Sequence, residues 1–498
     1  MIQNLDEQSA LKRFRTSRQT LKEIHDASNN PIKYQGFMMY QRLAVTRSFP
    51  NSIPAVVIFA VAAIALLAKD AQAEKAESNR RPNIVMIMAD DLGFECIGAN
   101  GGTSYRTPVL DKLASEGVRF EHCYSQPICT PSRVKLMTGI YNVRNYAEFG
   151  LLEKSQLTFA NLLRDAGYTT CITGKWQLGK DKTLPDHFGF DEHCLWQLFR
   201  RPSRYPSPGM EVNGEPIDYS PGYGPDVATE YAIDFIERNR DQPFLLYYPM
   251  ILTHCPFEPT PDSADWDPTS KGSPTYKGDA RYFGDMVAYM DKQVGRILEQ
   301  LDRVGVRENT LVLFTGDNGT DVPVVSTMRG REVAGAKGKT TDGGTRVPLI
   351  AQWKGKTAKG VVCNDIVDFS DFLPTVCEAA GAEVPTSLAI DGRSFLPQLM
   401  GDSGNPREWI YVWYARNGGA KGAEFTRDQR YKLYRSGKFY DIEKDVLEES
   451  PLEWNRLSNE VQSVHAKLEQ ALDRYANARP EKFANWKQNK NKNKKKKN

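Results

Sequence analysis

Short apolar runs alternate with amphipathic stretches along most of the chain. The run NIVMIMA at 83–89 is almost continuously apolar and ends at two aspartates, and similar runs occur at 169–173, 244–250, 310–316 and 347–353. Continuous apolar runs of this length are typical of strands that are buried on both faces of a parallel sheet. Because the runs alternate with helical patterns, the sequence predicts an α/β fold.

The amphipathic stretches between these runs predict helices that cover the sheet. An apolar stripe at helical spacing predicts one long helix with a buried face. A second helix is expected over 227–238, with Asp226 capping its first turn. The residues of the stripe are Phe283, Met286, Met290, Val294, Ile297 and Leu301. We assign them to the core and not to a cofactor site.

The pattern changes after about residue 405. The segments WIYVWYA, RYKLYRSG and KFYDI predict short antiparallel strands, and 457–475 predicts a closing helix. We therefore expect a large domain over 74–405 and a small C-terminal α+β subdomain over 406–480. The Lys- and Asn-rich residues 481–498 predict a disordered tail, which is either merely solvated or able to bind anionic polymers.

The N-terminal segment has the features of an export signal. Basic Arg42 and Arg47 precede an apolar run at 53–68, and Ala-Gln-Ala at 71–73 is a small-x-small cleavage site. We expect residues 1–73 to be a leader that is cleaved near 73/74. The mature protein is then exported, either periplasmic or secreted.

A membrane anchor is the alternative interpretation of this apolar run. The run has 16 residues, whereas roughly 20 are needed to span a bilayer. The sequence therefore favours a signal peptide without a stable membrane anchor. The residues before Met38 are polar and exceed what a signal peptide requires, so Met38 or Met39 is a candidate for the true start.

Charge and cysteine content exclude several classes of protein. The formal net charge of +3 includes +4 from residues 1–73 and +7 from 487–497, which leaves −8 for the body of the chain. An acidic body argues against a nucleic-acid-binding domain. The eight cysteines show no CxxC spacing, which argues against a structural zinc site or a disulfide-dense scaffold. One or two disulfides remain compatible with the sequence.

Polar residues follow three of the predicted strands. Asp90 and Asp91 follow the first strand, His254 follows the run at 244–250, and Asp317 and Asn318 follow the run at 310–316. Ligands bind at the carboxyl ends of strands in open α/β sheets, and adjacent carboxylates are costly unless a cation neutralises them. Two such pairs of oxygen ligands favour Ca²⁺ or Mg²⁺ over zinc. A helix cap or an ordinary loop is the alternative for either pair alone.

The segment 199–225 has no periodicity and is rich in Pro, Gly, Tyr and Arg. It is too long for an ordinary connection. It is therefore a candidate substrate-binding loop, and a surface insertion without function is an equally good interpretation.

Three sequence motifs occur in an order that identifies a family. Cys129-Thr130-Pro131-Ser132-Arg133, followed by VKLMTG, resembles the sulfatase signature C-x-P-S-R-x-x-x-[LM]-T-G, in which a maturation enzyme oxidises the Cys to formylglycine. GYTTCITGKWQLG at 167–179 resembles the second signature of the family, and GAKGKTTDGGTRVPLI at 335–350 resembles its lysine-bearing segment. The similarity extends from 82 to 353 and weakens toward the C-terminus.

This resemblance implies the fold and the activity of a sulfatase, and the large domain over 74–405 is then the catalytic domain. The implied fold is alkaline phosphatase-like, with a large mixed, mostly parallel sheet flanked by helices and a small C-terminal α+β subdomain. The implied activity is hydrolysis of sulfate esters by an arylsulfatase-like enzyme, with sulfated glycans among the possible substrates.

The resemblance also implies roles for individual residues. Asp90, Asp91, Asp317 and Asn318 would hold a divalent cation, calcium or magnesium, together with an oxygen of the modified Cys129. Arg133 would anchor the formylglycine. Lys175 and Lys337 would bind the sulfate group. His254 would contact the ester and protonate the leaving oxygen.

The chemistry of sulfate transfer favours these residue types. A thiol nucleophile offers no easy route to release sulfate, whereas one hydroxyl of an aldehyde hydrate attacks sulfur and displaces the alcohol. The other hydroxyl then loses its proton, reforms the carbonyl and expels sulfate. Negative charge builds on the transferred group, so a cation, two lysines and an arginine supply electrostatic stabilisation.

Gln177 departs from the family pattern. The family commonly has His after the Trp of the GKW motif, and that His is thought to handle the proton of the aldehyde hydrate. Gln cannot act as a base, so a water or another residue takes over this role, or activity is reduced.

Two other functions fit parts of the pattern. A phosphodiesterase or phosphonate hydrolase of the same superfamily is one, because phosphate and sulfate esters are near isosteres. A catalytically weak sulfated-glycan-binding protein is the other, suggested by Gln177 and the basic tail.

Overall fold

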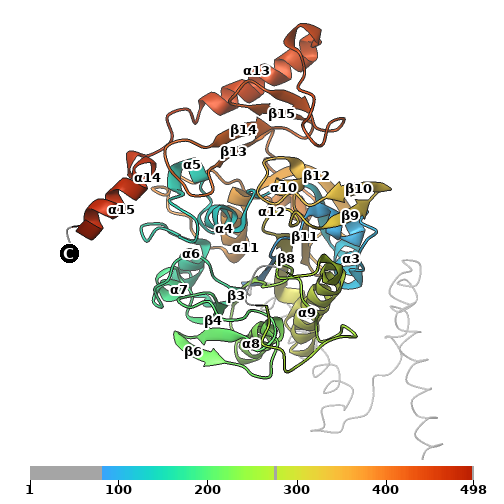
Figure 1. Cartoon of the computed structure of the whole chain (residues 1–498), viewed down its shortest axis with the longest axis vertical. Coiled ribbons are helices and arrows are strands. Elements are labelled where there is room, and N and C mark those ends of the chain that lie inside the picture. The colour runs from blue at the N-terminus through green and yellow to red at the C-terminus, as the bar shows by residue number, and fades with distance from the viewer. Residues whose placement is uncertain (1–80, 274–277, 496–498) are drawn as a thin grey trace, which may run out of the picture. The chain divides into compact units, whose positions relative to one another are not determined.

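The computed structural model describes residues 81–273 and 278–495, which fall in one structural unit (Figure 1). The predicted leader and its cleavage site lie outside the described residues. Among the described residues, no helix is long and apolar enough to cross a membrane. All eight cysteines are free thiols, so the structure contains none of the disulfides that the sequence allowed.

A ten-stranded mixed sheet forms the centre of this unit. Its central strands β8, β1, β7, β3 and β4 run parallel, whereas β11 is antiparallel to both of its neighbours. The order across the sheet is β12 (Val361–Asp368), β2 (Val118–Tyr124), β11 (Leu349–Trp353), β8 (Thr310–Gly316), β1 (Asn83–Ala89), β7 (Phe244–Pro249), β3 (Thr169–Lys175), β4 (Glu192–Trp196), β5 (Gly209–Val212) and β6 (Glu215–Asp218). The predicted large and mostly parallel sheet is thereby confirmed.

The central strands are buried on both faces, as their continuous apolar sequences predict. Along β1, Ile84, Met86 and Met88 belong to one hydrophobic core, and Val85 and Ile87 belong to a second core. Successive side chains of a strand point to opposite faces. One apolar layer therefore lies on each face of the sheet.

Helices cover both faces of the sheet. Helices α4, α6 and α11 contribute to the first core, and α3, α8 and α9 contribute to the second. The helices of this region are α3 (Pro108–Glu116), α4 (Cys129–Thr138), α5 (Asn142–Asn145), α6 (Phe159–Asp165), α7 (Leu184–His187), α8 (Gly224–Arg238), α9 (Phe283–Arg303), α10 (Asp342–Thr345), α11 (Phe372–Ala380) and α12 (Leu396–Met400). A hairpin of β9 (Val325–Met328) and β10 (Arg331–Ala334) stands apart from the large sheet.

The C-terminal part forms the expected small α+β structure. Its four-stranded antiparallel sheet has the order β13 (Ile410–Tyr414), β14 (Ala423–Arg427), β15 (Tyr431–Tyr434) and β16 (Phe439–Asp441). Helix α13 (Asn459–Asp473) lies along this sheet, where Thr426 Oγ1 donates to the carbonyl of Leu468 at 2.9 Å (Figure 1). The strand β14 had no counterpart among the sequence predictions.

Two local predictions differ from the structure. Asp226 does not cap α8, because Pro225 lies in the first turn and the helix already begins at Gly224. Proline at this position needs no hydrogen-bond partner and fixes a helical φ. The carboxylate of Asp226 instead accepts hydrogen bonds from Tyr289 and Gln293 of α9. All six residues of the predicted apolar stripe are buried on α9, which confirms that assignment.

The segment expected to be disordered contains two helices, α14 (Glu481–Ala484) and α15 (Trp486–Lys495). Phe483 is buried, and its ring stacks on Trp486 with 6.1 Å between the centroids. The guanidinium of Arg479 lies 5.7 Å from the centre of the Phe483 ring. These two aromatic residues give the start of the tail apolar surface to bury, which the prediction from its Lys-rich composition did not consider.

Candidate active site

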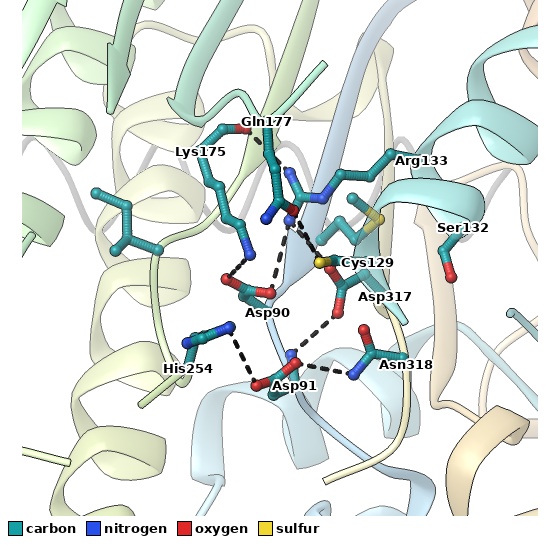
Figure 2. A network of polar contacts seen from close by, with 12 residues as sticks. Asp90, Asp91, Cys129, Ser132, Arg133, Lys175, Gln177, His254, Asp317 and Asn318 are labelled. Atoms are coloured by element: carbon teal, nitrogen blue, oxygen red, sulfur yellow. Dashed lines mark hydrogen bonds and ion pairs between the residues drawn. The ribbon is translucent and has the colours of Figure 1, made fainter. Parts of the chain in front are cut away.

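The polar residues predicted from the strand ends meet at one edge of the sheet (Figure 2). Strands β8, β1, β7 and β3 are neighbours and run parallel, so their carboxyl ends lie side by side. Asp90 and Asp91 follow β1, Asp317 and Asn318 follow β8, and Lys175 is the last residue of β3. This topology brings together residues that are more than 200 positions apart in the sequence.

Three buried carboxylates and one buried amide form the centre of the site. The backbone N–H of Asp91 donates to Asp317 Oδ1 at 3.0 Å, and Asn318 Nδ2 donates to Asp91 Oδ1 at 2.8 Å. Among the described residues, Asp90 Oδ1 and Asn318 Oδ1 accept no hydrogen bond, although both are buried. Buried oxygens without a donor suit a hard cation that prefers oxygen ligands. These residues therefore fit the predicted metal site.

Cys129 is the first residue of α4 and lies beside the carboxylates of Asp90 and Asp317. Its Sγ and one oxygen each of Asp90 and Asp317 lie within 4.8 Å of one another. Pro131 is accommodated in the first turn of the helix, where no N–H is needed. Ser132 Oγ donates to the carbonyl of Ile128 at 3.0 Å and fixes the start of this turn. The signature sequence thus positions residue 129 beside the carboxylates.

The thiol of Cys129 is poorly suited to act as a thiolate. It is 2% exposed and donates to Gln177 Oε1 at 2.8 Å. Burial raises the pKa of the Cys129 thiol, and the positive charge of Lys175 offsets this only in part. A nucleophilic cysteine requires the opposite shift. The surroundings of the unmodified residue therefore favour the protonated thiol over the thiolate.

Three cations balance the three carboxylates. Arg133 Nη2 lies 3.0 Å from Asp317 Oδ2, and Arg133 Nη1 donates to the carbonyl of Lys175 at 3.0 Å. Lys175 Nζ lies 2.6 Å from Asp90 Oδ2, and Lys337 Nζ contacts the carboxylate of Asp91. Each charged group thus has a partner of opposite sign.

The carboxylates lie close enough to change one another's pKa values. Burial and the charge of Asp90 raise the pKa of Asp317 to about 7, against the opposing effect of Arg133. Burial also raises the pKa of Asp90, but Lys175 and the other surrounding cations outweigh this effect and hold it well below its ordinary value. Paired carboxylates with separated pKa values are characteristic of functional sites.

His254 is held as a neutral imidazole. Burial and the charge of Lys337 lower the pKa of His254 well below its usual value. Its Nδ1 lies 2.5 Å from the carbonyl of Cys255, and its Nε2 lies 3.0 Å from Lys337 Nζ. His254 Nε2 therefore accepts from the lysine, and the two side chains form one unit beside Asp91.

A cavity of about 340 Å³ opens onto these groups. Its lining includes Cys129, Gln177, His254 and Lys337, which the sequence singled out. It also includes Phe149, Gln197, Arg201, Asp321 and Arg416, which the sequence analysis did not assign to the site. Of these, Arg201 alone falls in the segment 199–225 that was considered as a substrate loop, and no local pattern marks the others.

Comparison with known families identifies the chain. The model described as Sulfatase matches residues 82–382, and the model described as N-sulphoglucosamine sulphohydrolase, C-terminal, matches residues 338–478. Arylsulfatase A of Bos taurus is 32% identical over 393 residues, which cover 71% of this chain and 74% of that protein.

Solved structures share the same architecture. The crystal structure of Ps i-CgsB superposes with a TM-score of 0.69 and 26% identity, and covers 80% of this chain and 94% of that one. Its complex with k-i-k-neocarrahexaose gives a TM-score of 0.67 at 25% identity over the same shares of the two chains. Phosphonate monoester hydrolase of Agrobacterium radiobacter shares the fold, with a TM-score of 0.59 and 21% identity, over 79% of this chain and 95% of that one. The chain therefore has the alkaline phosphatase-like fold and belongs to the sulfatase family, whose members are sulfuric ester hydrolases.

Proposed function

We propose that this protein is an exported sulfatase that uses a formylglycine made from Cys129 and a bound divalent cation, calcium or magnesium. The observation that carries the proposal is the position of Cys129, which lies within 4.8 Å of the Asp90 and Asp317 carboxylates and lines the same cavity as His254 and Lys337. A protonated thiol is a poor nucleophile, whereas a hydroxyl of an aldehyde hydrate at this place can attack the sulfur of a sulfate ester.

The metal ligands in this proposal are Asp90, Asp91, Asp317, Asn318 and an oxygen of the modified residue 129. A bound cation would neutralise negative charge that develops on the transferred group. The two buried oxygens that accept no hydrogen bond from the described residues, on Asp90 and Asn318, support this ligand set. The all-oxygen ligands favour calcium or magnesium over zinc.

The remaining charged residues bind and orient the sulfate group. Lys175 Nζ contacts the carboxylate of Asp90 (Figure 2), and Lys337 Nζ contacts that of Asp91, so both lysines reach the centre of the site, where they can hold sulfate oxygens. Arg133 is fixed by Asp317 and by the carbonyl of Lys175. It lies one turn after residue 129 on α4, where it would anchor the formylglycine. The Lys337–His254 pair lines the cavity, and the proton for the leaving oxygen would pass from the Lys337 ammonium to His254 Nε2, which lies 3.0 Å away, and from His254 to the ester oxygen.

Sulfated carbohydrates are the substrate class that we favour. The C-terminal match carries the name of an amino-sugar sulfohydrolase, and the similar Ps i-CgsB has been crystallised with k-i-k-neocarrahexaose. Export to the periplasm or the cell exterior would give access to such polymers. A formylglycine-generating maturation enzyme is the partner that this function requires.

The proposal is tested on protein made in its native host. Trypsin releases the peptide 120–133, and its mass should show that the Cys129 side chain has lost its sulfur and gained a carbonyl oxygen. The same preparation should hydrolyse an aryl sulfate much faster than an aryl phosphodiester. Faster hydrolysis of the phosphodiester would instead support a phosphodiesterase or phosphonate hydrolase. An unmodified thiol without turnover would support a sulfated-glycan-binding protein.

Removal of the metal gives an independent test. We expect a chelator to abolish aryl sulfate hydrolysis and added Ca²⁺ or Mg²⁺ to restore it, because the carboxylates are arranged for an oxygen-ligated cation. The variant N318L should need a higher ion concentration for the same recovery, since it removes one ligand oxygen. Full activity in the chelated enzyme would contradict the metal site.

A further inference from the structure

A second cavity adjoins the active-site cavity. Its volume is about 560 Å³. Arg201 lines both cavities, and the consecutive residues Cys255 and Pro256 line one cavity each. A ligand that places its sulfate ester against Lys337 can therefore extend into this second space. The mechanism proposed above makes no use of it.

Among the described residues that line the second cavity, positive charges outnumber negative ones. Arg201, Arg204 and Lys271 contribute three positive charges, and among the described lining residues Glu258 is the single carboxylate. Glu258 Oε1 accepts a hydrogen bond from the backbone N–H of Ser273. Burial and the charge of Arg204 lower the pKa of Arg201, which shows that the two guanidinium groups act on each other. An anion between them would relieve this repulsion.

Arg204 is held rigidly in this position. It is 5% exposed, and its guanidinium lies 4.1 Å from the centre of the Trp196 ring. Trp196 is the last residue of β4, and its carbonyl accepts from the N–H of Trp176, directly after Lys175. The arginine therefore rests on the strand next to the one that carries a sulfate-binding lysine.

Tyr205, the residue after Arg204, connects this loop to the segment that carries His254. The hydroxyl of Tyr205 donates to the carbonyl of Ile251 at 3.1 Å and also to the carbonyl of His254. Two buried aromatic residues thus fix Arg204 relative to both Lys175 and His254. A guanidinium that is fixed in advance loses little conformational entropy when it binds a ligand.

We propose that the second cavity binds another anionic group of the same substrate, a sulfate or carboxylate on the sugar unit next to the one that is desulfated. Arg204 provides the bidentate contact, and Arg201 lies between the two anion sites. This inference rests on the proposed function and narrows its substrate class to carbohydrates with anionic groups on adjacent units.

The test measures binding in the C129A variant, which cannot form the nucleophile. The two ligands are a disaccharide with one sulfate and the same disaccharide with a second sulfate on the neighbouring unit. We expect C129A to bind the disulfated ligand about tenfold more tightly or better, as a charge-assisted bidentate contact provides. Adding R204M should bring the ratio of the two Kd values close to one, and higher salt should reduce the ratio.

R240M serves as the matched control, because Arg240 is exposed and lines neither cavity. It should leave the ratio of the Kd values unchanged. R201M is the second variant if R204M does not fold, since Arg201 is exposed and its replacement leaves the core intact. Equal binding of both ligands by C129A, or a preference that persists in R204M and R201M, would overturn the inference. Failure of the wild-type protein to hydrolyse any sulfate ester would instead overturn the proposed function and leave the binding result standing.

Discussion

Gln177 is the residue that most sets this site apart from the family pattern. It has a φ of 56°, a left-handed conformation that is unusual outside glycine. Its Oε1 accepts from the Cys129 thiol, so it contacts the residue that we expect to become the nucleophile. An amide can orient the hydrate at this position but cannot take its proton.

The variant Q177H should therefore raise kcat for aryl sulfate hydrolysis. A positioned base contributes about 10²-fold or more when proton transfer limits the rate, and a histidine that replaces Gln177 supplies one in contact with residue 129. The pH profile of kcat should gain a limb near the ordinary pKa of histidine, about 6.5. An unchanged kcat and an unchanged profile would show that another group already handles this proton.

Lys337 contacts both the carboxylate of Asp91 and the imidazole of His254. We expect K337M to lower kcat/KM by about 10²- to 10³-fold, the usual cost of losing one group that stabilises developing charge. K339M is the control, because Lys339 is exposed and two positions away. Steady-state kinetics on an aryl sulfate measure both variants. A loss of less than fivefold in K337M would contradict its role at the sulfate group.

At the scale of the elements, apolar runs predicted five strands of the large sheet, β1, β3, β7, β8 and β11, whereas its other five strands had no counterpart among the predictions. The strands at 83–89 and 310–316 have the predicted bounds, because both are buried on two faces. The run at 347–353 forms a strand only from Leu349, since Pro348 cannot donate to the ladder.

The same comparison explains which site residues were found. Asp90 and Asp317 were found because strand ends share one edge of the sheet. Arg416 was not found, and Arg204 was indicated only as part of the segment 199–225, because their positions depend on how irregular segments pack and periodicity does not report packing. The contact of Gln177 with Cys129 likewise joins the residues after β3 to the start of α4, 48 positions apart in the sequence.

Helix α3 is capped from another element. The carboxylate of Asp291 on α9 accepts hydrogen bonds from the N–H groups of Val109 and Leu110, both at 2.9 Å. Burial nevertheless raises the pKa of Asp291 to about 6, above its ordinary value, and these hydrogen bonds offset only part of the effect. The folded protein then binds a proton more tightly than the unfolded chain does, so this group's contribution to stability falls as pH rises from about 4 to about 6.

We expect D291N to remove this dependence on pH. The wild-type free energy of unfolding should contain a component that decreases by up to about 1.4 kcal/mol per pH unit in that interval. The component should be missing in D291N, because the amide does not titrate. Urea unfolding at several pH values measures both proteins. Parallel curves for the two proteins would show that Asp291 does not titrate in this range.

At the scale of the whole molecule, the C-terminal sheet holds the segment that carries Lys337. Arg427 of β14 pairs with Asp342. The hydroxyl groups of Tyr434 and Thr340 lie 2.9 Å apart, and Lys432 Nζ donates to the Thr340 carbonyl. The small sheet therefore helps to hold the segment that carries Lys337 in place.

Breaking this connection should cost stability. Arg427 and Asp342 are both largely buried, and removing one partner of such a pair typically costs about 3–5 kcal/mol. We expect R427M to lower the free energy of unfolding by that amount. R430M is the control from the residue directly before β15, because Arg430 is 42% exposed and solvent screens its pair with Asp441, so its loss should cost much less stability. Equal effects in the two variants would contradict this assignment.

The contacts of the C-terminal sheet with residues 340 and 342 also mean that the site is completed late during biosynthesis. Translation delivers Cys129 long before it delivers β14 and β15. The segment that carries Lys337 cannot make its contacts with β14 and β15 until most of the polypeptide has left the ribosome. A nascent chain therefore passes through a period in which Cys129 exists and its surroundings are incomplete. If Cys129 is oxidised as proposed above, this is the period in which the thiol, 2% exposed in the folded chain, would be accessible to a maturation enzyme.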